Sequence, residues 1–236
     1  MPNFPTDREA REAILDIGRR MYERRFGAAN DGNISIRVAD GFWCTPTGVS
    51  KGHMTEDMLC KIDENRNILS GSRTPSSEIR MHLRVYREDE NVVSVAHSHA
   101  PAATSFAAAG LPLDDALITE AVVTLGVVPL APFALPSTEQ VPDSVAPYIK
   151  GYSAVLLENH GVLTWGQDAF EAYYRMETVE HYAQILLNVR YLMGSRATIS
   201  PDRVEALLGL RRKLGIQTGG TPGELGGCPM NRKEAR

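Results

Sequence analysis

Two histidines one residue apart follow an apolar run in the middle of the chain. Residues 92–96 read Val-Val-Ser-Val-Ala, and His97-Ser98-His99 comes directly after them. A short β-branched run predicts a buried strand, on which residues two apart point to the same face. Both imidazoles can therefore reach one metal ion, and imidazole suits Zn²⁺ or, with other donors, Fe, Ni or Mn. The alternative for this pair alone is two histidines at an exposed strand end.

A third histidine stands in a similar position. His160 follows another apolar run and precedes Gly161, which permits a close turn that brings the imidazole ring inward. A catalytic metal needs three protein ligands and one open position. On its own His160 indicates little, but with His97 and His99 it completes a set of three.

A carboxylate can supply a fourth donor. The segment 74–77 (Thr-Pro-Ser-Ser) predicts the start of a helix, whose dipole favours the anionic form of Glu78 in its first turn. Ordinary first-turn electrostatics is the alternative explanation for Glu78. His82 lies four residues further on the same helical face and competes as a ligand. We interpret His82 as a packed histidine or as a support for a ligand.

Three turns rich in small residues have the composition of an anion site. Each offers backbone N–H groups and a short hydroxyl or amide side chain, and one lies where a helix begins, a position that favours phosphate. Plain turn chemistry explains each turn alone, and none matches a Walker or dinucleotide fingerprint. The residues are Gly32-Asn33, Thr47-Gly48 and Ser76-Ser77.

Helices and strands of ordinary length surround these residues. A capping box of Thr6 and Glu9 predicts a first helix that ends near Gly27. Periodicity and turn residues predict the remaining elements. We expect strands at 33–38, 42–44, 60–63, 68–70, 153–158 and 162–165, a β-branched apolar stretch at 125–130, and helices at 78–86, 101–109, 137–150, 168–194 and from 200 onward.

The composition is that of an ordinary globular protein. Of 236 residues, 43% are hydrophobic and 23% charged, and the net charge of -4 gives no reason to expect a nucleic acid or an anionic membrane as partner. No apolar run approaches the ~20 residues that span a bilayer. The N-terminus lacks the order of a signal peptide, and Cys44, Cys60 and Cys228 have no paired spacing, so we expect a reducing, cytoplasmic location.

Short strands mixed with helices favour one α/β domain with a mixed or largely antiparallel sheet. We assign residues 1–216 to this domain. From 217 to 236 the composition shifts to Gly, Pro and charge, so we expect a disordered tail there.

Five short motifs in a fixed order resemble the class II aldolase/adducin family, and within it the fuculose-phosphate type of sugar-phosphate aldolase. The resemblance covers about residues 9–216, and the order of the motifs makes it specific. The motifs are Gly-Asn-Ile-Ser at 32–35, Thr-Pro-Thr-Gly at 45–48, Pro-Ser-Ser-Glu at 75–78, His-Ser-His at 97–99 and Asn-His-Gly at 159–161.

The resemblance implies a fold, an assembly and a site. The implied fold is a single three-layer α/β/α domain around a mostly antiparallel sheet, assembled as a homotetramer with active sites between subunits. One divalent metal per subunit, most often Zn²⁺ with Mn²⁺, Co²⁺ or Fe²⁺ as alternatives, would bind Glu78, His97, His99 and His160. The three turns at Gly32-Asn33, Thr47-Gly48 and Ser76-Ser77 would hold the phosphate of a phosphorylated sugar.

The implied reaction is the reversible cleavage of a short-chain ketose 1-phosphate to dihydroxyacetone phosphate and an aldehyde. Substrates of the fuculose-, ribulose- or deoxypentulose-1-phosphate type fit this class. A metal stabilises the developing enediolate as a Lewis acid, and Glu78 would be the catalytic residue that accepts a proton.

The chain departs from the fuculose-phosphate enzymes at two tyrosines. Those enzymes carry one in the segment that corresponds to 117–121, which here reads Leu-Ile-Thr-Glu-Ala, and a second one that corresponds to Leu214. Glu120 is the nearest ionisable group, and we interpret it as a surface or interface charge. The proton donor and the aldehyde specificity therefore stay open.

Other functions use the same residues. A ketose-phosphate 4-epimerase and a 3-oxo sugar-acid phosphate decarboxylase pass through metal-bound enolates or retro-aldol steps as well, so the metal motif does not separate them from an aldolase. A non-catalytic binding module like the head of adducin is a further alternative. The complete ligand set argues against it, because a scaffold has no physical need for such a set.

Overall fold

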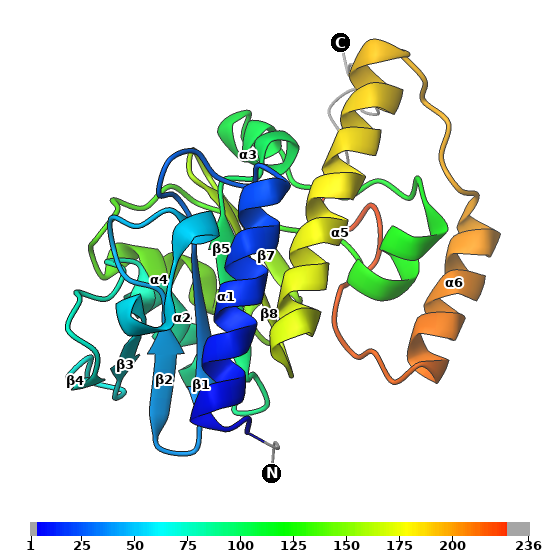
Figure 1. Ribbon diagram of the computed structural model, residues 1–236. Coiled ribbons are helices and arrows are strands. Elements are labelled where there is room, and N and C mark those ends of the chain that lie inside the picture. Colours follow the sequence, from blue (N-terminus) through cyan, green and yellow to red (C-terminus); the bar gives the residue numbers. More distant parts are fainter. Residues whose placement is uncertain (1–3, 226–236) are drawn as a thin grey trace.

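Eight strands form one sheet in the computed structural model, which describes residues 4–225 (Figure 1). The strand order is β4-β3-β2-β1-β5-β8-β7-β6. All neighbours are antiparallel except β6 and β7, which are parallel. The strands are β1 (Asn33–Val38), β2 (Gly41–Cys44), β3 (Cys60–Ile62), β4 (Ile68–Ser70), β5 (Ser94–Ser98), β6 (Leu130–Ala131), β7 (Ala154–Leu157) and β8 (Gly161–Gly166).

Helices cover both faces of the sheet, so the predicted α/β/α arrangement is confirmed. Helices α1, α3 and α5 contribute to the hydrophobic core on one face, and α2 and α4 to the core on the other. Helix α6 stands apart from the sheet, beyond α5 (Figure 1). The helices are α1 (Asp7–Glu23), α2 (Ile79–Glu88), α3 (Pro101–Ala108), α4 (Gln140–Val145), α5 (Ala169–Leu187) and α6 (Pro201–Lys213), with shorter 3-10 or π turns η1 (Lys51–His53), η2 (Glu56–Met58), η3 (Ala121–Leu125), η4 (Ala146–Tyr148) and η5 (Asn188–Leu192).

Local sequence signals start the two helices that flank the central strands. The side chain of Thr6 accepts a hydrogen bond from the Glu9 N–H, and the Glu9 carboxylate accepts one from the Thr6 N–H, so the predicted capping box is present. The Asp168 side chain accepts from the Glu171 N–H at the start of α5. These bonds satisfy N–H groups that a helix leaves unpaired at its first turn.

Strand β5 lies in the middle of the sheet and carries the histidine motif. Its five residues are all buried, which explains the apolar run before His97. Ala96 packs in the core beneath α1, α3 and α5, whereas Val95 packs in the core beneath α2 and α4. Because side chains alternate along a strand, His97 shares the face of Val95 and points toward α2.

Two predicted elements differ from the structure. The β-branched stretch at 125–130 pairs only at Leu130–Ala131, because the residues before it form the π turn η3 and an isolated bridge to Leu113. The helix expected at 137–150 begins at Gln140 and gives way to the 3-10 turn η4. Pro142 lies in the first turn of α4, where its missing N–H does not interrupt the helix.

The first part of the expected tail, residues 217–225, is hydrogen-bonded to the domain. The buried Arg211 guanidinium donates to the Gly220 carbonyl at 2.7 Å, and the buried Asp114 carboxylate accepts from Gly223 N at 2.7 Å and Leu225 N at 2.9 Å. Composition could not reveal these contacts, because Asp114 lies 109 residues from Gly223 and Arg211 meets Gly220 only when the chain turns back after α6. Residues 226–236 lie outside the described residues, as does Cys228.

The described helices include none that is both long enough and apolar enough to cross a membrane.

Candidate active site

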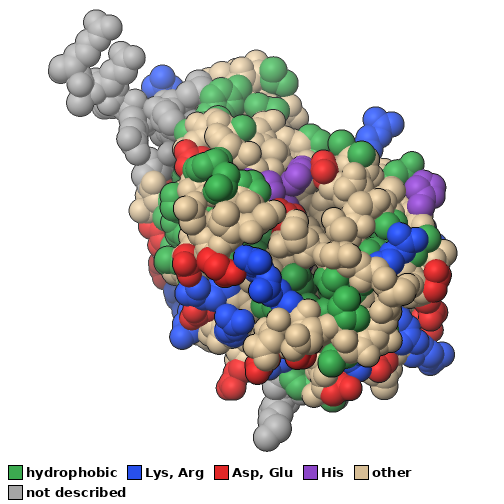
Figure 2. Space-filling model, turned by 90° about the vertical axis from the view of Figure 1, so that its left-hand side faces the viewer, with side chains coloured by type: hydrophobic (Ala, Val, Ile, Leu, Met, Phe, Trp, Pro, Cys, Tyr) green, Lys and Arg blue, Asp and Glu red, His purple; other side chains and the backbone are tan. Residues whose placement is uncertain are grey.

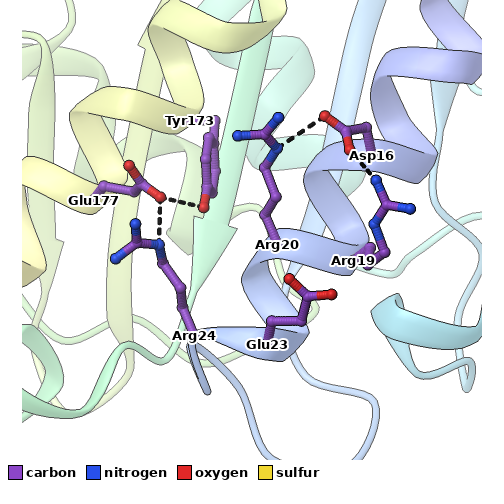
Figure 3. Close-up of a pocket in the computed structure, with 7 residues that line it drawn as sticks. All are labelled: Asp16, Arg19, Arg20, Glu23, Arg24, Tyr173 and Glu177. Atoms are coloured by element: carbon purple, nitrogen blue, oxygen red, sulfur yellow. Dashed lines mark hydrogen bonds and ion pairs between the residues drawn. The ribbon is translucent and has the colours of Figure 1, made fainter.

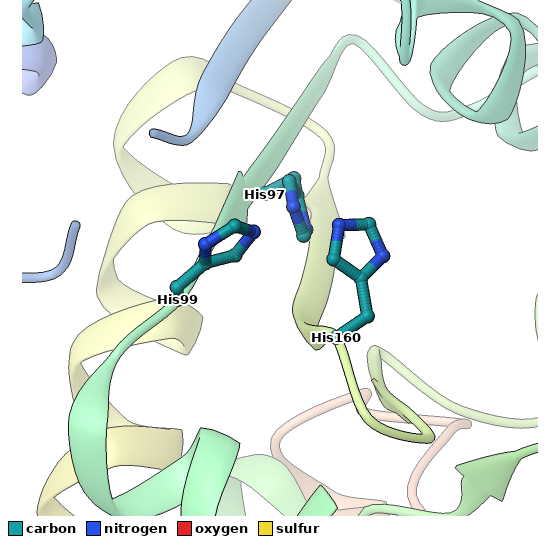
Figure 4. Close-up of side chains that lie close together, drawn as sticks. All are labelled: His97, His99 and His160. Carbon is teal, nitrogen blue, oxygen red and sulfur yellow. The ribbon is translucent and has the colours of Figure 1, made fainter. Parts of the chain in front are cut away.

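Three histidines from two segments come together beside β5 (Figure 4). His97 lies in β5, His99 follows the strand end, and His160 lies in the turn before β8. The ring centroids are 5.1 Å apart for His97 and His99, 4.7 Å for His97 and His160, and 5.1 Å for His99 and His160. One nitrogen from each ring lies within 4.8 Å of the others. The three rings therefore point at one shared volume.

Two of these rings are held through Nδ1, which leaves Nε2 free. His97 Nδ1 lies 2.9 Å from the Val162 carbonyl, which only accepts, so Nδ1 carries the proton. His99 Nδ1 lies 3.2 Å from the Asp31 carboxylate. Within the described part of the chain, the buried Nε2 atoms of His97 and His99 have no hydrogen-bond partner. Buried polar atoms are rarely left unsatisfied, and free imidazole lone pairs fit a metal ion.

Burial controls the charge of the central ring. His97 is fully buried, which lowers its pKa to about 4 even though Glu78 opposes the shift. At neutral pH the ring is therefore uncharged. A metal binds only the uncharged form of imidazole, so this environment suits a ligand.

Glu78 faces the histidines from the start of α2. It is the N-cap residue but makes no side-chain cap, because its carboxylate turns toward the rings. Oε1 lies 2.8 Å from His160 Nε2, and Oε2 lies 3.4 Å from His97 Nε2 and 2.6 Å from Asn33 Nδ2. Burial raises the pKa of Glu78, but His97, His160 and Asn33 outweigh burial and hold the pKa well below its ordinary value. The carboxylate is therefore ionised.

The turn that carries His160 has two special positions. Asn159 adopts the left-handed backbone conformation, with a φ of 59°, which asparagine tolerates better than most residues. Gly161 is needed for space rather than for an unusual backbone conformation. A Cβ at Gly161 would lie 2.4 Å from the Ser98 carbonyl oxygen and 3.2 Å from His97 Cε1. Any larger residue here would push the two histidine-bearing segments apart.

His82 is a packed side chain and lies outside the group of three. It is fully buried, and its Nδ1 lies 2.8 Å from the Ser35 hydroxyl, which in turn lies 2.8 Å from the Tyr86 hydroxyl. Burial, with a smaller effect of His97, lowers the pKa of His82 to about 3. His82 therefore stays neutral and ties α2 to β1.

The three small-residue turns lie beside this group. Thr47 N donates to the Thr74 carbonyl at 2.9 Å, and Ser76 N donates to the Thr45 carbonyl at 3.2 Å, so the second and third turns are joined directly. Gly32 and Gly48 adopt φ values of 80° and 70°, which glycine tolerates without strain.

Some of the predicted anion donors are already used. The amide of Asn33 donates to Glu78, and the N–H groups of Thr47 and Ser76 join the two turns. Gly48 N and Ser77 N make no hydrogen bond with any described residue, and the space beside the Gly48 α-carbon is open. Gly32 N likewise has no partner among the described residues, so these three N–H groups and the nearby hydroxyls are donors available to an anion.

Residues without a motif also belong to the site. Asp31 contacts His99, and the buried ammonium of Lys51 donates to the carbonyls of Asn30 and Val49 in the loops around the turns. The sequence carries no local signal for either residue, because their partners are defined only by the fold. Glu120 is exposed and its carboxylate accepts from the Thr119 hydroxyl, consistent with a surface charge.

Histidine side chains reach the molecular surface on one face of the protein (Figure 2). In Figure 2, histidine side chains lie in a hollow next to acidic side chains. A separate cavity of about 390 Å³ lies between α1 and α5 (Figure 3). In that cavity Arg19 and Arg20 pair with Asp16, and Arg24 pairs with Glu177. Each of these arginines is therefore already paired with a carboxylate of the same cavity.

Comparison with known proteins identifies the family. Residues 12–187 match the family described as Class II Aldolase and Adducin N-terminal domain. The match covers well over half of the chain, and it contains all three histidines and Glu78. The protein belongs to the class II aldolase and adducin family.

Relatives within this family include two kinds of enzyme. The chain is 33% identical over 183 residues to an L-fuculose phosphate aldolase of Methanococcus maripaludis, covering 77% of this chain and 96% of that protein. It is 28% identical over 199 residues to a 3-oxo-tetronate 4-phosphate decarboxylase of Pectobacterium atrosepticum, covering 82% of this chain and 89% of that protein. The protein is thus an enzyme of the class II aldolase superfamily.

Solved structures agree with this assignment. An L-fuculose 1-phosphate aldolase superposes with a TM-score of 0.79 and 25% identity, covering 90% of this chain and 98% of that chain. The likeness extends beyond the sheet because coverage of this length includes most of the helices.

Proposed function

We propose that the protein is a divalent-metal-dependent aldolase that reversibly cleaves a short-chain ketose 1-phosphate to dihydroxyacetone phosphate and an aldehyde. The observation that carries this proposal is the convergence of two buried Nε2 atoms without a hydrogen bond among the described residues, those of His97 and His99, beside His160 and the Glu78 carboxylate. Three histidines with one open position are the ligand set of catalytic zinc sites.

In this proposal His97, His99, His160 and Glu78 hold one divalent cation, Zn²⁺ first and Mn²⁺, Co²⁺ or Fe²⁺ as alternatives. The ion supplies Lewis-acid stabilisation of negative charge as the carbon–carbon bond breaks. The donor set fits such an ion because Nδ1 of His97 and His99 is occupied by the Val162 carbonyl and the Asp31 carboxylate. These contacts fix the direction of each ring before any ion binds.

Glu78 is the proposed proton acceptor. Its carboxylate is ionised and lies beside the histidines, where it can take a proton from a bound substrate. The Asn33 amide holds Oε2 at 2.6 Å and so orients the carboxylate.

A substrate phosphate is proposed to bind the three turns. Their N–H and hydroxyl groups would fix the phosphate, and through it the position of the reacting carbons relative to Glu78. The residues are Gly32, Asn33, Thr47, Gly48, Ser76 and Ser77, of which Gly32, Gly48 and Ser77 offer N–H groups without a partner among the described residues.

A decarboxylase of 3-oxo sugar-acid phosphates is the second candidate, with a ketose-phosphate 4-epimerase as a further possibility on the same residues. Two observations favour the decarboxylase. Relatives of that kind match over 82% of the chain, and the segment 117–121 lacks the tyrosine of the fuculose-phosphate enzymes. A non-catalytic, adducin-like module is disfavoured by the complete set of ligands.

The deciding experiment is a product assay on protein purified without chelators. Fuculose-, ribulose- and deoxypentulose-1-phosphate are supplied in turn, and dihydroxyacetone phosphate is detected by its coupled reduction with NADH. We expect dihydroxyacetone phosphate from at least one ketose and about one divalent metal per subunit. Release of CO2 from a 3-oxo acid phosphate, or an epimer with an intact carbon chain, would reject the aldolase in favour of an alternative.

Two variants calibrate this assay. In His97→Ala one ligand is lost, so both bound metal and product formation should disappear. His181→Ala removes an exposed histidine of α5 and should change neither. Stoichiometric metal in active His97→Ala protein would refute the ligand assignment, and metal-free wild-type protein would favour the binding module.

We also propose that the protein forms a homotetramer with active sites between subunits. Large apolar side chains are exposed at the end of α5, in η5 and directly after it, where Leu192 is 76% and Met193 75% exposed. Exposed apolar residues gathered in one region are a common sign of a protein–protein interface.

A further inference from the structure

Lys51 is a buried lysine without a carboxylate partner. Only 5% of it is exposed, and among the described residues no Asp or Glu lies within ion-pair distance of its ammonium. Lys61 provides the contrast, since it is similarly buried but lies 3.0 Å from Asp7 and 2.7 Å from Asp40. A buried cation is costly unless an anion compensates it. Lys51 therefore lacks the direct ion pairs that compensate Lys61.

The ammonium of Lys51 joins two loops at the proposed phosphate site. It donates to the Asn30 carbonyl at 2.8 Å and to the Val49 carbonyl at 2.7 Å. Asn30 lies just before Gly32-Asn33, and Val49 directly follows Gly48. Two of the three ammonium protons are used in this way, and the third has no acceptor among the described residues.

Helix α1 fixes the position of Lys51. A Cβ at Gly18 would lie 2.7 Å from the Lys51 carbonyl oxygen, so the glycine lets η1 pack directly on the helix. The side chain consequently starts from a rigid element and reaches back between the loops. Burial lowers its pKa to about 8, although Asp31 and Glu78 oppose the shift, so the ammonium is charged at neutral pH.

We infer that Lys51 is the cationic positioning residue of the anion site: its ammonium clamps the two loops that carry Gly32-Asn33 and Thr47-Gly48, and its charge compensates a bound phosphate group. This inference rests on the proposed function, because that function supplies the phosphate. The six predicted phosphate-binding residues are all uncharged, whereas a phosphate monoester carries nearly two negative charges. Lys51 supplies the missing positive charge from beneath the loops.

The test measures the affinity of the metal-loaded protein for inorganic phosphate by calorimetry. Three variants separate charge from hydrogen bonding: Lys51→Met removes both, Lys51→Gln keeps a donor without charge, and Lys51→Arg keeps the charge. We expect the phosphate Kd to rise about tenfold or more in the Met and Gln variants and to stay within about threefold in the Arg variant, since a charge-assisted hydrogen bond is about twice as strong as a neutral one. Lys213→Met, which removes an exposed lysine of α6, is the control and should leave the Kd unchanged.

Turnover adds a second readout that a merely structural role would not produce. With the ketose phosphate substrate, KM should rise about as much as the phosphate Kd while kcat changes little, because the phosphate lies away from the reacting carbons. Metal content should stay at the wild-type level in every Lys51 variant. Should Lys51→Met fail to fold, Lys51→Gln and Lys51→Arg still decide the question.

The outcomes distinguish this inference from the proposed reaction. Unchanged phosphate affinity in folded Lys51→Met or Lys51→Gln, or no phosphate binding by the wild type, would overturn the role of Lys51 even if dihydroxyacetone phosphate is released. Weakened phosphate binding in these variants, without release of dihydroxyacetone phosphate by the wild type, would uphold the role of Lys51 and reject the aldolase.

Discussion

At the scale of single residues, the groups in contact with Nδ1 of His97 and His99 determine which ring nitrogen each histidine can offer to a metal ion. The Asp31 carboxylate lies 3.2 Å from His99 Nδ1, and the Val162 carbonyl accepts from His97 Nδ1. Both rings consequently present Nε2 to the same volume. The carboxylate differs from the carbonyl in one respect, because it places a negative charge directly behind a ring that would bind a cation.

Asp31→Asn tests this contact. The amide keeps an oxygen that can accept from His99 but removes the charge, so we expect metal affinity to fall about 10- to 100-fold, as is typical when such an outer contact is lost. Competition with a metal chelator gives the Kd. Asp57→Asn, at an exposed carboxylate of η2, serves as control, and equal affinity in both variants would mean that Asp31 does not support the ligand.

His82 predicts a dependence of stability on pH. Its pKa is about 3 in the folded protein, against 6.5 for a histidine in an unfolded chain, so only the unfolded state binds the proton between these values. The free energy of unfolding should therefore fall as pH decreases from about 6.5 toward 3, by up to about 1.4 kcal/mol per pH unit from this group. Urea unfolding of metal-free protein at several pH values measures the slope.

His82→Gln isolates this contribution. The amide oxygen can still accept from the Ser35 hydroxyl, so the hydrogen bond to β1 is retained, while the titration disappears. His97 titrates in both proteins and cancels in the comparison. An identical pH slope in wild type and variant would show that His82 does not resist protonation in the folded state.

At the scale of elements, the sequence predicted most of the framework that positions the site. Thr6 with Glu9 and Asp168 with Glu171 act within four residues of each other, so their capping roles can be recognised without a fold. The strand before His97 was predicted for the same reason, because a run of β-branched residues favours a strand without reference to distant segments.

Contacts between distant segments could not be predicted in this way. Lys51 satisfies the carbonyls of two separate loops, and Asp114 accepts from Gly223 N and Leu225 N, in a segment whose composition predicts disorder. The side chain of Glu78 was expected at the metal, but its hydrogen bond to Asn33 depends on how β1 and α2 pack. Such pairings depend on three-dimensional proximity rather than on sequence pattern.

Glu180 makes another contact of this kind, with the start of helix α3, which follows His99. Its buried carboxylate accepts from Ala102 N at 3.0 Å and from Ala103 N at 2.9 Å, at the start of α3. Helix α3 has no side-chain cap from its own N-cap residue. Glu180 in α5 therefore satisfies the helix terminus from across the core.

Glu180→Gln should be costly because one oxygen is replaced by an N–H₂ group that cannot accept. We expect a loss of about 2 kcal/mol in the free energy of unfolding, the usual penalty for an unsatisfied buried donor. Glu205→Gln, which affects an exposed ion pair with Arg212, should cost well under 1 kcal/mol. Equal stability of the two variants in urea would contradict the capping role.

At the scale of the whole molecule, large apolar side chains are exposed at the C-terminal end of α5 and in the turn that follows it. This helix packs against β5, the strand that carries His97. Helix α5 covers β5 and β8, and its C-terminal end continues into η5, where Tyr191 and Leu192 are exposed, as is Met193 directly after it. Leu187 and Tyr191 also line an apolar groove beside Phe106 of α3. An interface at this position would connect directly to the elements that carry His99.

We expect the proposed tetramer to use this surface. The double variant Leu192→Lys, Met193→Lys tests this expectation. Burying a large apolar side chain contributes about 1.5–3 kcal/mol, and two lysines would place unpaired charges in the contact, so the tetramer should dissociate to smaller species at micromolar protein. Light scattering coupled to size-exclusion chromatography measures the mass. Ile68→Lys replaces a side chain that is 51% exposed at the far edge of the sheet and should leave the mass unchanged. A monomeric wild type would reject the tetramer, and an intact tetramer in the double variant would move the interface elsewhere.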